Sequence, residues 1–252
     1  QIAEKISPDG FEFMIYDQLY ADPKAYARRV NAFGLRFVTA HLDKDIGELI
    51  SRNEGGDVEK ALSMFKINCE FAREIGAGLG VLHLWGGIYS DRNIEVNFSV
   101  YPKLLEIARE NGIVLAIENI PCNQNENPFL RWRELFERFP EGLAFTLDTR
   151  FTEFHGLFES LYKMDWLWEN KLVRHVHISD YKGGTLEWAN LRRALPIGEG
   201  QVDFERFFAF LMEKGYGGAV TIESSSMLTG EVVPEILQDN IEYVRKRTGG
   251  AV

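Results

Sequence analysis

The sequence predicts an α/β chain that folds as one parallel (β/α)8 barrel spanning residues 1–252. Short apolar runs that fit buried strands alternate with longer stretches that fit helices, and no linker-like segment interrupts them. Polar residues end most of these apolar runs. A closed barrel would bring all of these strand ends together, whereas a doubly wound sheet usually concentrates its ligands at one switch point. The barrel is therefore the better prediction.

Seven strands and seven helices are expected in alternation. Asp22 as a cap, Pro23 at the first helical position and Gly34 after the last turn define the first helix. A polar loop with Gly55 and Gly56 precedes the second helix. The expected strands are residues 11–16, 37–42, 80–85, 113–118, 143–148, 173–180 and 219–223, and the expected helices are 22–33, 58–75, 96–110, one ending near 139, 157–168, 203–214 and 231–246.

The barrel's first strand is not found in the sequence. Residues 1–9 resemble the end of a helix, so that strand is expected upstream of Gln1. The strand at residues 11–16 would then be the second of eight.

Composition narrows the classes of function. An apolar share of 45% permits a sizeable core, and a net charge of −10 argues against a surface that grips nucleic-acid phosphates. Two cysteines, Cys69 and Cys122, provide no disulfide framework, which favours reduced thiols in a cytoplasm. No apolar run is long enough to span a bilayer. We therefore expect a cytoplasmic protein with neither a nucleic-acid nor a membrane partner.

Four apolar runs end in side chains that can bind a metal: Glu118, Asp148, His177 and Glu223. A carboxylate at the end of a buried strand is costly to desolvate unless it is paired or bound to a metal. Alternatives remain open for each residue. The two glutamates could form structural ion pairs, Asp148 could cap a helix, and His177 could be a core histidine.

The chain resembles the xylose-isomerase-like TIM barrel superfamily, which includes sugar isomerases and epimerases and endonuclease-IV-type enzymes. The resemblance is carried in order by 117–119 (Ile-Glu-Asn), 147–149 (Leu-Asp-Thr), 175–180 (His-Val-His-Ile-Ser-Asp), 198–200 (Gly-Glu-Gly) with 203–204 (Asp-Phe), and 221–224 (Thr-Ile-Glu-Ser). It implies one divalent metal held by Glu118, Asp148, His177 and Glu223. Three carboxylates and one imidazole suit Mn²⁺, Mg²⁺ or Co²⁺, and Zn²⁺ is a further candidate.

Further residues are candidates for substrate binding. His41 and His83 end earlier strands; the resemblance implies extra metals at such positions in the endonuclease branch and substrate contact, which we favour, in the epimerase branch. Trp85 and Lys182 are also candidates, whereas His175 is expected to pair with Glu12 in the core. The family often has a histidine three residues after the strand-ending aspartate. Here that position is Phe151, and Arg150 before it is a possible replacement.

The predicted function is that of a metal-dependent isomerase or epimerase of a sugar or related polyol-type carbonyl compound. It would proceed through an enediolate, with Glu118 and Glu223 as the acid–base pair on opposite faces of the substrate. A dehydratase or lyase acting on an inosose- or dehydroshikimate-like ring is the first alternative. An apurinic-site endonuclease and a non-catalytic binding barrel are less favoured. A homo-oligomer is compatible with the sequence.

Overall fold

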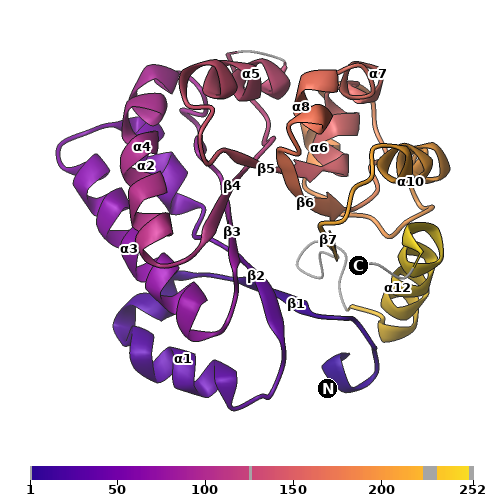
Figure 1. Ribbon diagram of the computed structural model, residues 1–252, viewed down its shortest axis with the longest axis horizontal. Helices are drawn as coiled ribbons and strands as arrows, with labels where there is room; N and C mark the ends of the chain where they lie inside the picture. The colour runs from indigo at the N-terminus through magenta and orange to yellow at the C-terminus, as the bar shows by residue number, and fades with distance from the viewer. Residues whose placement is uncertain (1, 125–126, 224–231, 250–252) are drawn as a thin grey trace. The chain divides into compact units, whose positions relative to one another are not determined.

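The structure is a computed structural model that describes residues 2–124, 127–223 and 232–249 (Figure 1). Within these residues the chain forms seven strands, each followed by helical structure. The strands are β1 (Phe11–Met14), β2 (Phe37–His41), β3 (Leu79–Leu82), β4 (Val114–Glu118), β5 (Ala144–Asp148), β6 (Val173–Ile178) and β7 (Ala219–Ile222).

The described helices differ widely in length. The α-helices are α1 (Pro23–Asn31), α2 (Asp45–Arg52), α3 (Asp57–Glu74), α4 (Ile94–Glu110), α5 (Pro128–Arg138), α6 (Thr149–Phe154), α7 (Phe158–Leu161), α8 (Asp165–Glu169), α9 (Trp188–Leu191), α10 (Phe204–Glu213) and α12 (Pro234–Thr248). Two 3₁₀ helices, η1 (Ile2–Glu4) and η2 (Asp17–Ala21), precede α1. Residues 2–10 contain no strand.

The chain divides into two compact units, residues 10–145 and residues 1–9 with 146–252, and each is described by itself. In the first unit β1 to β4 are neighbours in chain order, and β1–β2, β2–β3 and β3–β4 pair in parallel. Helices α2, α3 and α4 lie to one side of these strands (Figure 1). In the second unit β6 pairs in parallel with β7, and α10 packs against α12. Parallel strands joined by helices confirm the predicted α/β class.

Capping residues fix several helix starts where the sequence predicts them. The Asp22 carboxylate accepts a hydrogen bond from the Ala25 N–H with Pro23 in the first turn, and Asp203 does the same for Arg206 at α10. Each side chain satisfies an amide that has no partner inside its helix. These caps explain why the predicted and observed starts agree within a residue.

The sequence predicts a polar loop before the second helix. This prediction is wrong for residues 45–52, which form helix α2. Its apolar positions, Ile46, Leu49 and Ile50, recur at helical spacing and are buried. Gly47 is also required, since a Cβ there would lie 2.0 Å from the His83 carbonyl oxygen. Helix α2 therefore packs directly on the end of β3.

The single helix expected over residues 157–168 is also wrong. Two short helices, α7 and α8, occupy this range, and Met164 between them has a non-helical backbone (φ −89°, ψ 63°). Before them, α6 ends at Phe154, and Gly156, two residues further on, has a positive φ of 64°. The apolar residues of this segment therefore belong to short helices rather than to one face of a long helix.

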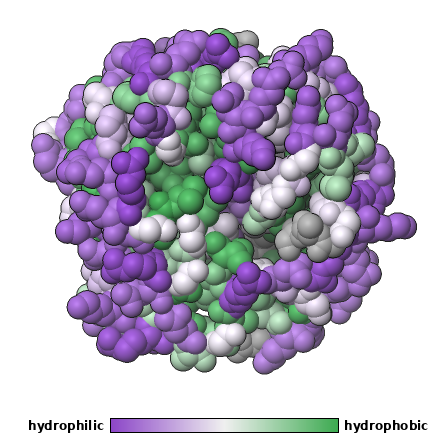
Figure 2. Space-filling model, in the orientation of Figure 1, coloured by the Kyte–Doolittle hydropathy of each residue, from purple (hydrophilic) through white to green (hydrophobic). Residues whose placement is uncertain are grey.

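Hydrophilic residues cover most of the face in Figure 2, with smaller apolar patches between them. Both cysteines are free and buried, as expected for reduced thiols. No helix among the described residues is long and apolar enough to cross a membrane.

Candidate active site

The second unit gathers three of the four predicted metal ligands. Asp148 ends β5, His177 lies near the end of β6, and Glu223 directly follows β7. One ligand atom from each lies within 4.8 Å of the others, and His177 Nδ1 is 3.4 Å from Glu223 Oε1. Asp148 and His177 are fully buried, whereas the Glu223 side chain is 18% exposed. The Glu223 N–H donates to the Ile178 carbonyl, so the β6–β7 hydrogen-bond ladder positions its backbone.

Arg150 lies against this cluster. Its Nη2 is 3.3 Å from Glu223 Oε2 and 3.6 Å from Asp148 Oδ2, and its Nη1 donates to the Leu191 carbonyl. The guanidinium also lies over the Phe151 ring, 4.6 Å from the ring centroid. Arg150 therefore takes part in this site, although position 151 is not a histidine.

Asp148 caps a helix, and its geometry leaves the role of metal ligand open as well. Its Oδ1 accepts a hydrogen bond from the Phe151 N–H and caps α6, while Oδ2 is the oxygen nearest Arg150. A carboxylate held in this way has a fixed orientation, so one oxygen can still serve as a ligand.

The first unit gathers a second cluster, formed by His41, His83 and Glu118. Glu118 Oε2 lies 2.6 Å from His83 Nε2 and 3.5 Å from His41 Nε2. His41 Nδ1 lies 3.0 Å from the Leu42 carbonyl, to which it can donate in the tautomer with its proton on Nδ1. Burial lowers the pKa of His83 to about 3, although the Glu118 charge opposes this shift. Burial therefore favours the neutral imidazole of His83, which can donate from Nε2 to the Glu118 carboxylate.

Both clusters are chemically suited to a divalent cation. Each combines carboxylate oxygen with imidazole nitrogen, and within each the potential ligand atoms lie within 4.8 Å of one another. Asp148 and Glu118 are nearly inaccessible to solvent, so a cation would offset the cost of burying their charge. The sharing of one ion by Glu118, Asp148, His177 and Glu223 stays a prediction, because Glu118 belongs to the other unit.

The remaining predicted residues have more varied environments. Trp85 is fully buried, whereas Lys182 is exposed just beyond β6. His175 is buried one strand layer below His177, with ring centroids 4.9 Å apart. Glu12 accepts a hydrogen bond from the Thr39 hydroxyl.

Lys44 is not among the site residues that the sequence predicts. It is exposed at the start of α2, and its charge contributes to lowering the pKa of His83. It lies three residues after His41, so a cation follows a strand-ending histidine. Because residues 45–52 were predicted as a loop, Lys44 was not placed at the start of a helix.

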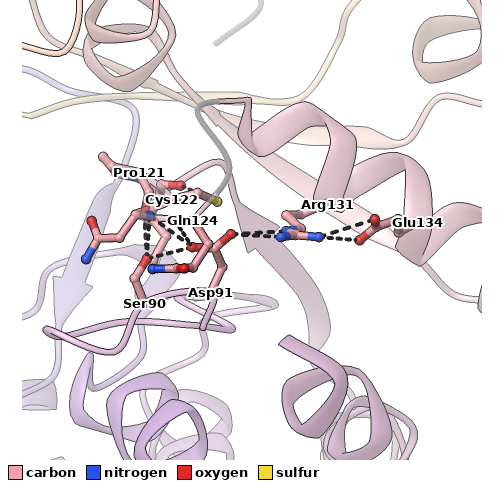
Figure 3. Close-up of polar contacts among 9 residues, drawn as sticks. Ser90, Asp91, Pro121, Cys122, Gln124, Arg131 and Glu134 are labelled. Carbon is pink, nitrogen blue, oxygen red and sulfur yellow. Dashed lines mark hydrogen bonds and ion pairs between the residues drawn. The ribbon is translucent and has the colours of Figure 1, made fainter. Parts of the chain in front are cut away.

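The loops after β3 and β4 are tied together by Asp91 (Figure 3). The Asp91 carboxylate accepts backbone hydrogen bonds from Asn123 and Gln124, and it pairs with Arg131 on α5 at 2.9 Å. Arg131 also reaches Glu134. Asp91 is fully buried, so this network fixes the segment that follows Glu118.

Asp180 organises the loop beyond β6. Its Oδ1 accepts hydrogen bonds from the N–H groups of Tyr181 and Val202, and its Oδ2 from those of Gly198 and Gly200. A Cβ on Gly200 would lie 2.3 Å from the Tyr181 carbonyl oxygen. The Gly198–Gly200 pattern therefore lets the backbone close around one buried carboxylate.

The chain belongs to the xylose isomerase-like TIM barrel family, whose model matches residues 1–247. This match confirms the predicted barrel and the family resemblance. The uncharacterized protein MJ1311 of Methanocaldococcus jannaschii is 28% identical over 188 residues, which make up 71% of this chain and 61% of that protein. The chain thus spans less than two thirds of the length of this relative.

Solved structures share the fold. A D-tagatose 3-epimerase-like protein is similar with a TM-score of 0.67 and 22% identity, over 95% of this chain and 90% of that one. The IOLI protein with a binding zinc atom is similar with a TM-score of 0.71 and 19% identity, over 97% and 88% of the two chains. At these identities the likeness shows the fold alone.

Proposed function

We propose that this chain is a divalent-metal-dependent isomerase or epimerase of a sugar or related polyol-type carbonyl compound. The observation that carries the proposal is the cluster of Asp148, His177 and Glu223 at the ends of three successive strands. Active sites in barrels of this class form at the carboxyl ends of the strands. The similar structures named for a sugar epimerase and for a bound zinc atom support the same class of reaction and of cofactor.

We propose Glu118, Asp148, His177 and Glu223 as the metal ligands. The ion would polarise the substrate carbonyl and so acidify the neighbouring C–H bond. Glu223 is the most accessible of the four ligands, with 18% of its side chain exposed, and is the first candidate to remove that proton. Glu118 would return a proton from the opposite face, which inverts the configuration at that carbon.

His83 and Arg150 contact these two carboxylates. Neutral His83 donates to Glu118 at 2.6 Å, which fixes that carboxylate without adding charge. Arg150 lies 3.3 Å from Glu223 and forms an ion pair with that carboxylate. We further propose that His41, Lys44 and Lys182 contact substrate oxygens, whereas buried Trp85 contributes shape rather than hydrogen bonds.

Solvent exchange tests this function. Mn²⁺-supplemented protein is incubated with a panel of ketoses in D₂O, and NMR scores both epimers and dehydration products. We expect deuterium to enter substrate and product at one carbon, only in the presence of metal. Glu223→Gln should lower turnover by at least about 10²–10⁴-fold, since that is the usual contribution of a positioned base.

The matched control is Glu199→Gln, which removes an exposed carboxylate from the loop after β6 and should leave turnover unchanged. Full activity after removal of the metal would refute the proposal. Efficient turnover without incorporation of solvent deuterium would indicate a hydride shift and refute the proton-transfer mechanism. Accumulation of dehydrated product would identify a lyase on the same scaffold.

A further inference from the structure

Arg150 contacts the same two carboxylates that the proposed function assigns to a metal. Its Nη2 lies 3.3 Å from Glu223 Oε2 and 3.6 Å from Asp148 Oδ2. Asp148 is fully buried, and the side chains of Arg150 and Glu223 are only 12% and 18% exposed. Charges this shielded from water interact far more strongly than surface pairs do.

The guanidinium group of Arg150 makes two further contacts. Its Nη1 donates to the Leu191 carbonyl, and its carbon lies over the Phe151 ring. These contacts keep the cation beside the cluster even if its Nη2 loses the carboxylates. Nη2 is therefore the part of the side chain whose partners can change.

We propose that Arg150 is a displaceable counter-cation of the Asp148–Glu223 pair and, once displaced, binds an oxyanion of the substrate. Asp148 and Glu223 cannot give the same oxygens fully to a guanidinium and to a divalent ion, so the two cations compete. Metal binding thereby releases the Nη2 hydrogens beside a second positive charge. A site with two adjacent cations favours a ligand that carries negative charge.

The inference deepens the proposed function and rests on it, because it names a substrate class for the same site. It favours a polyol compound that carries a carboxylate over a neutral sugar. Planar guanidinium groups bind carboxylates with well-defined geometry, which a lysine at this position would not reproduce.

The first test measures metal affinity by titration calorimetry with Mn²⁺. Arg150→Met removes the competing cation, so we expect Mn²⁺ to bind about tenfold more tightly, which corresponds to about 1.4 kcal/mol. Arg150→Lys retains the charge and should stay close to the parent protein. The matched control is Arg174→Met, which removes one exposed positive charge at the start of β6, away from its site-forming end.

A stability measurement separates competition from simple loss of packing. Without metal, Arg150→Met leaves Asp148 and Glu223 without this counter-charge, so its melting temperature should fall. Addition of Mn²⁺ should then raise it by more than in the parent protein. A purely structural role would lower the melting temperature to the same extent with and without metal.

The second test compares two small probes on the Mn²⁺-loaded protein. Glycolate and ethylene glycol both present vicinal oxygens, but only glycolate carries a carboxylate. We expect Arg150→Met to weaken glycolate binding about tenfold and to leave ethylene glycol binding unchanged.

The outcomes distinguish the inference from the function on which it rests. If the parent binds Mn²⁺ and Arg150→Met binds it equally well or more weakly, the counter-cation is refuted and the proposed function stands. Equal glycolate affinity in the parent and in Arg150→Met would refute the oxyanion site. If the parent binds no divalent metal, the proposed function falls as well.

Discussion

Replacement of Asp180 by asparagine should destabilise the protein strongly. The Asp180 carboxylate is buried and accepts four backbone hydrogen bonds, two on each oxygen. An asparagine amide keeps one oxygen and presents an NH₂ group in place of the other. In both amide orientations, two backbone N–H groups then face a donor instead of an acceptor. Leaving a buried donor unsatisfied costs about 1–3 kcal/mol, so the expected loss is about 2–6 kcal/mol.

Urea denaturation of the parent and of Asp180→Asn measures this loss. It would be a large share of the stability of a typical domain, which is about 5–15 kcal/mol. Asp165→Asn is the control, because that exposed side chain contacts only Lys214 among the described hydrogen bonds and ion pairs, and its stability should be nearly unchanged. A loss below about 1 kcal/mol for Asp180→Asn would show that water replaces the carboxylate in this loop.

Three further predictions concern other parts of the chain. Arg131→Met leaves the buried Asp91 without its guanidinium partner, so urea denaturation should show a loss of about 3–5 kcal/mol; a loss no larger than that of an exposed-pair variant would contradict it. Hydrogen bonding to Arg52 lowers the pKa of Asp57 to about 2, below its unfolded value, so the stability it contributes is present above about pH 4 and is lost as pH falls toward 2. Asp57→Asn should flatten that part of the stability–pH curve, and an unchanged curve would remove Asp57 as its cause. Mn²⁺ at a hundredfold excess over its Kd should stabilise the parent by about 2.7 kcal/mol, and His177→Ala should abolish this gain in a thermal melt; a retained gain would place the ion elsewhere.

The fold was predictable where residue order alone decides local structure. The strand ends at Glu118 and Asp148, and the place of His177 near the end of β6, follow from apolar runs that stop at a polar residue. Helix α2 was not predictable in this way, because an eight-residue helix has little stability of its own and depends on tertiary contacts. The close approach of Gly47 to the His83 carbonyl cannot be predicted from the spacing of residues in the sequence.

The candidate site was likewise predictable from the sequence only in part. Parity along the strand places His177 and the deeper His175 on one face, and the structure agrees. The Arg150–Glu223 pair joins residues 73 positions apart, so no local pattern contains it. The low pKa of His83 is likewise a consequence of burial rather than of neighbouring sequence.

Gly47 has a consequence for how this part of the chain can vary. A single methyl group at this position would overlap the main chain at the end of β3, and backbone cannot rotate away as a side chain can. Position 47 therefore tolerates no other amino acid unless the helix moves off the strand. Such a movement would carry Lys44 with it and shift the charge that acts on His83. The absence of a side chain at position 47 thus sets how far Lys44 stands from His83, the histidine that follows β3.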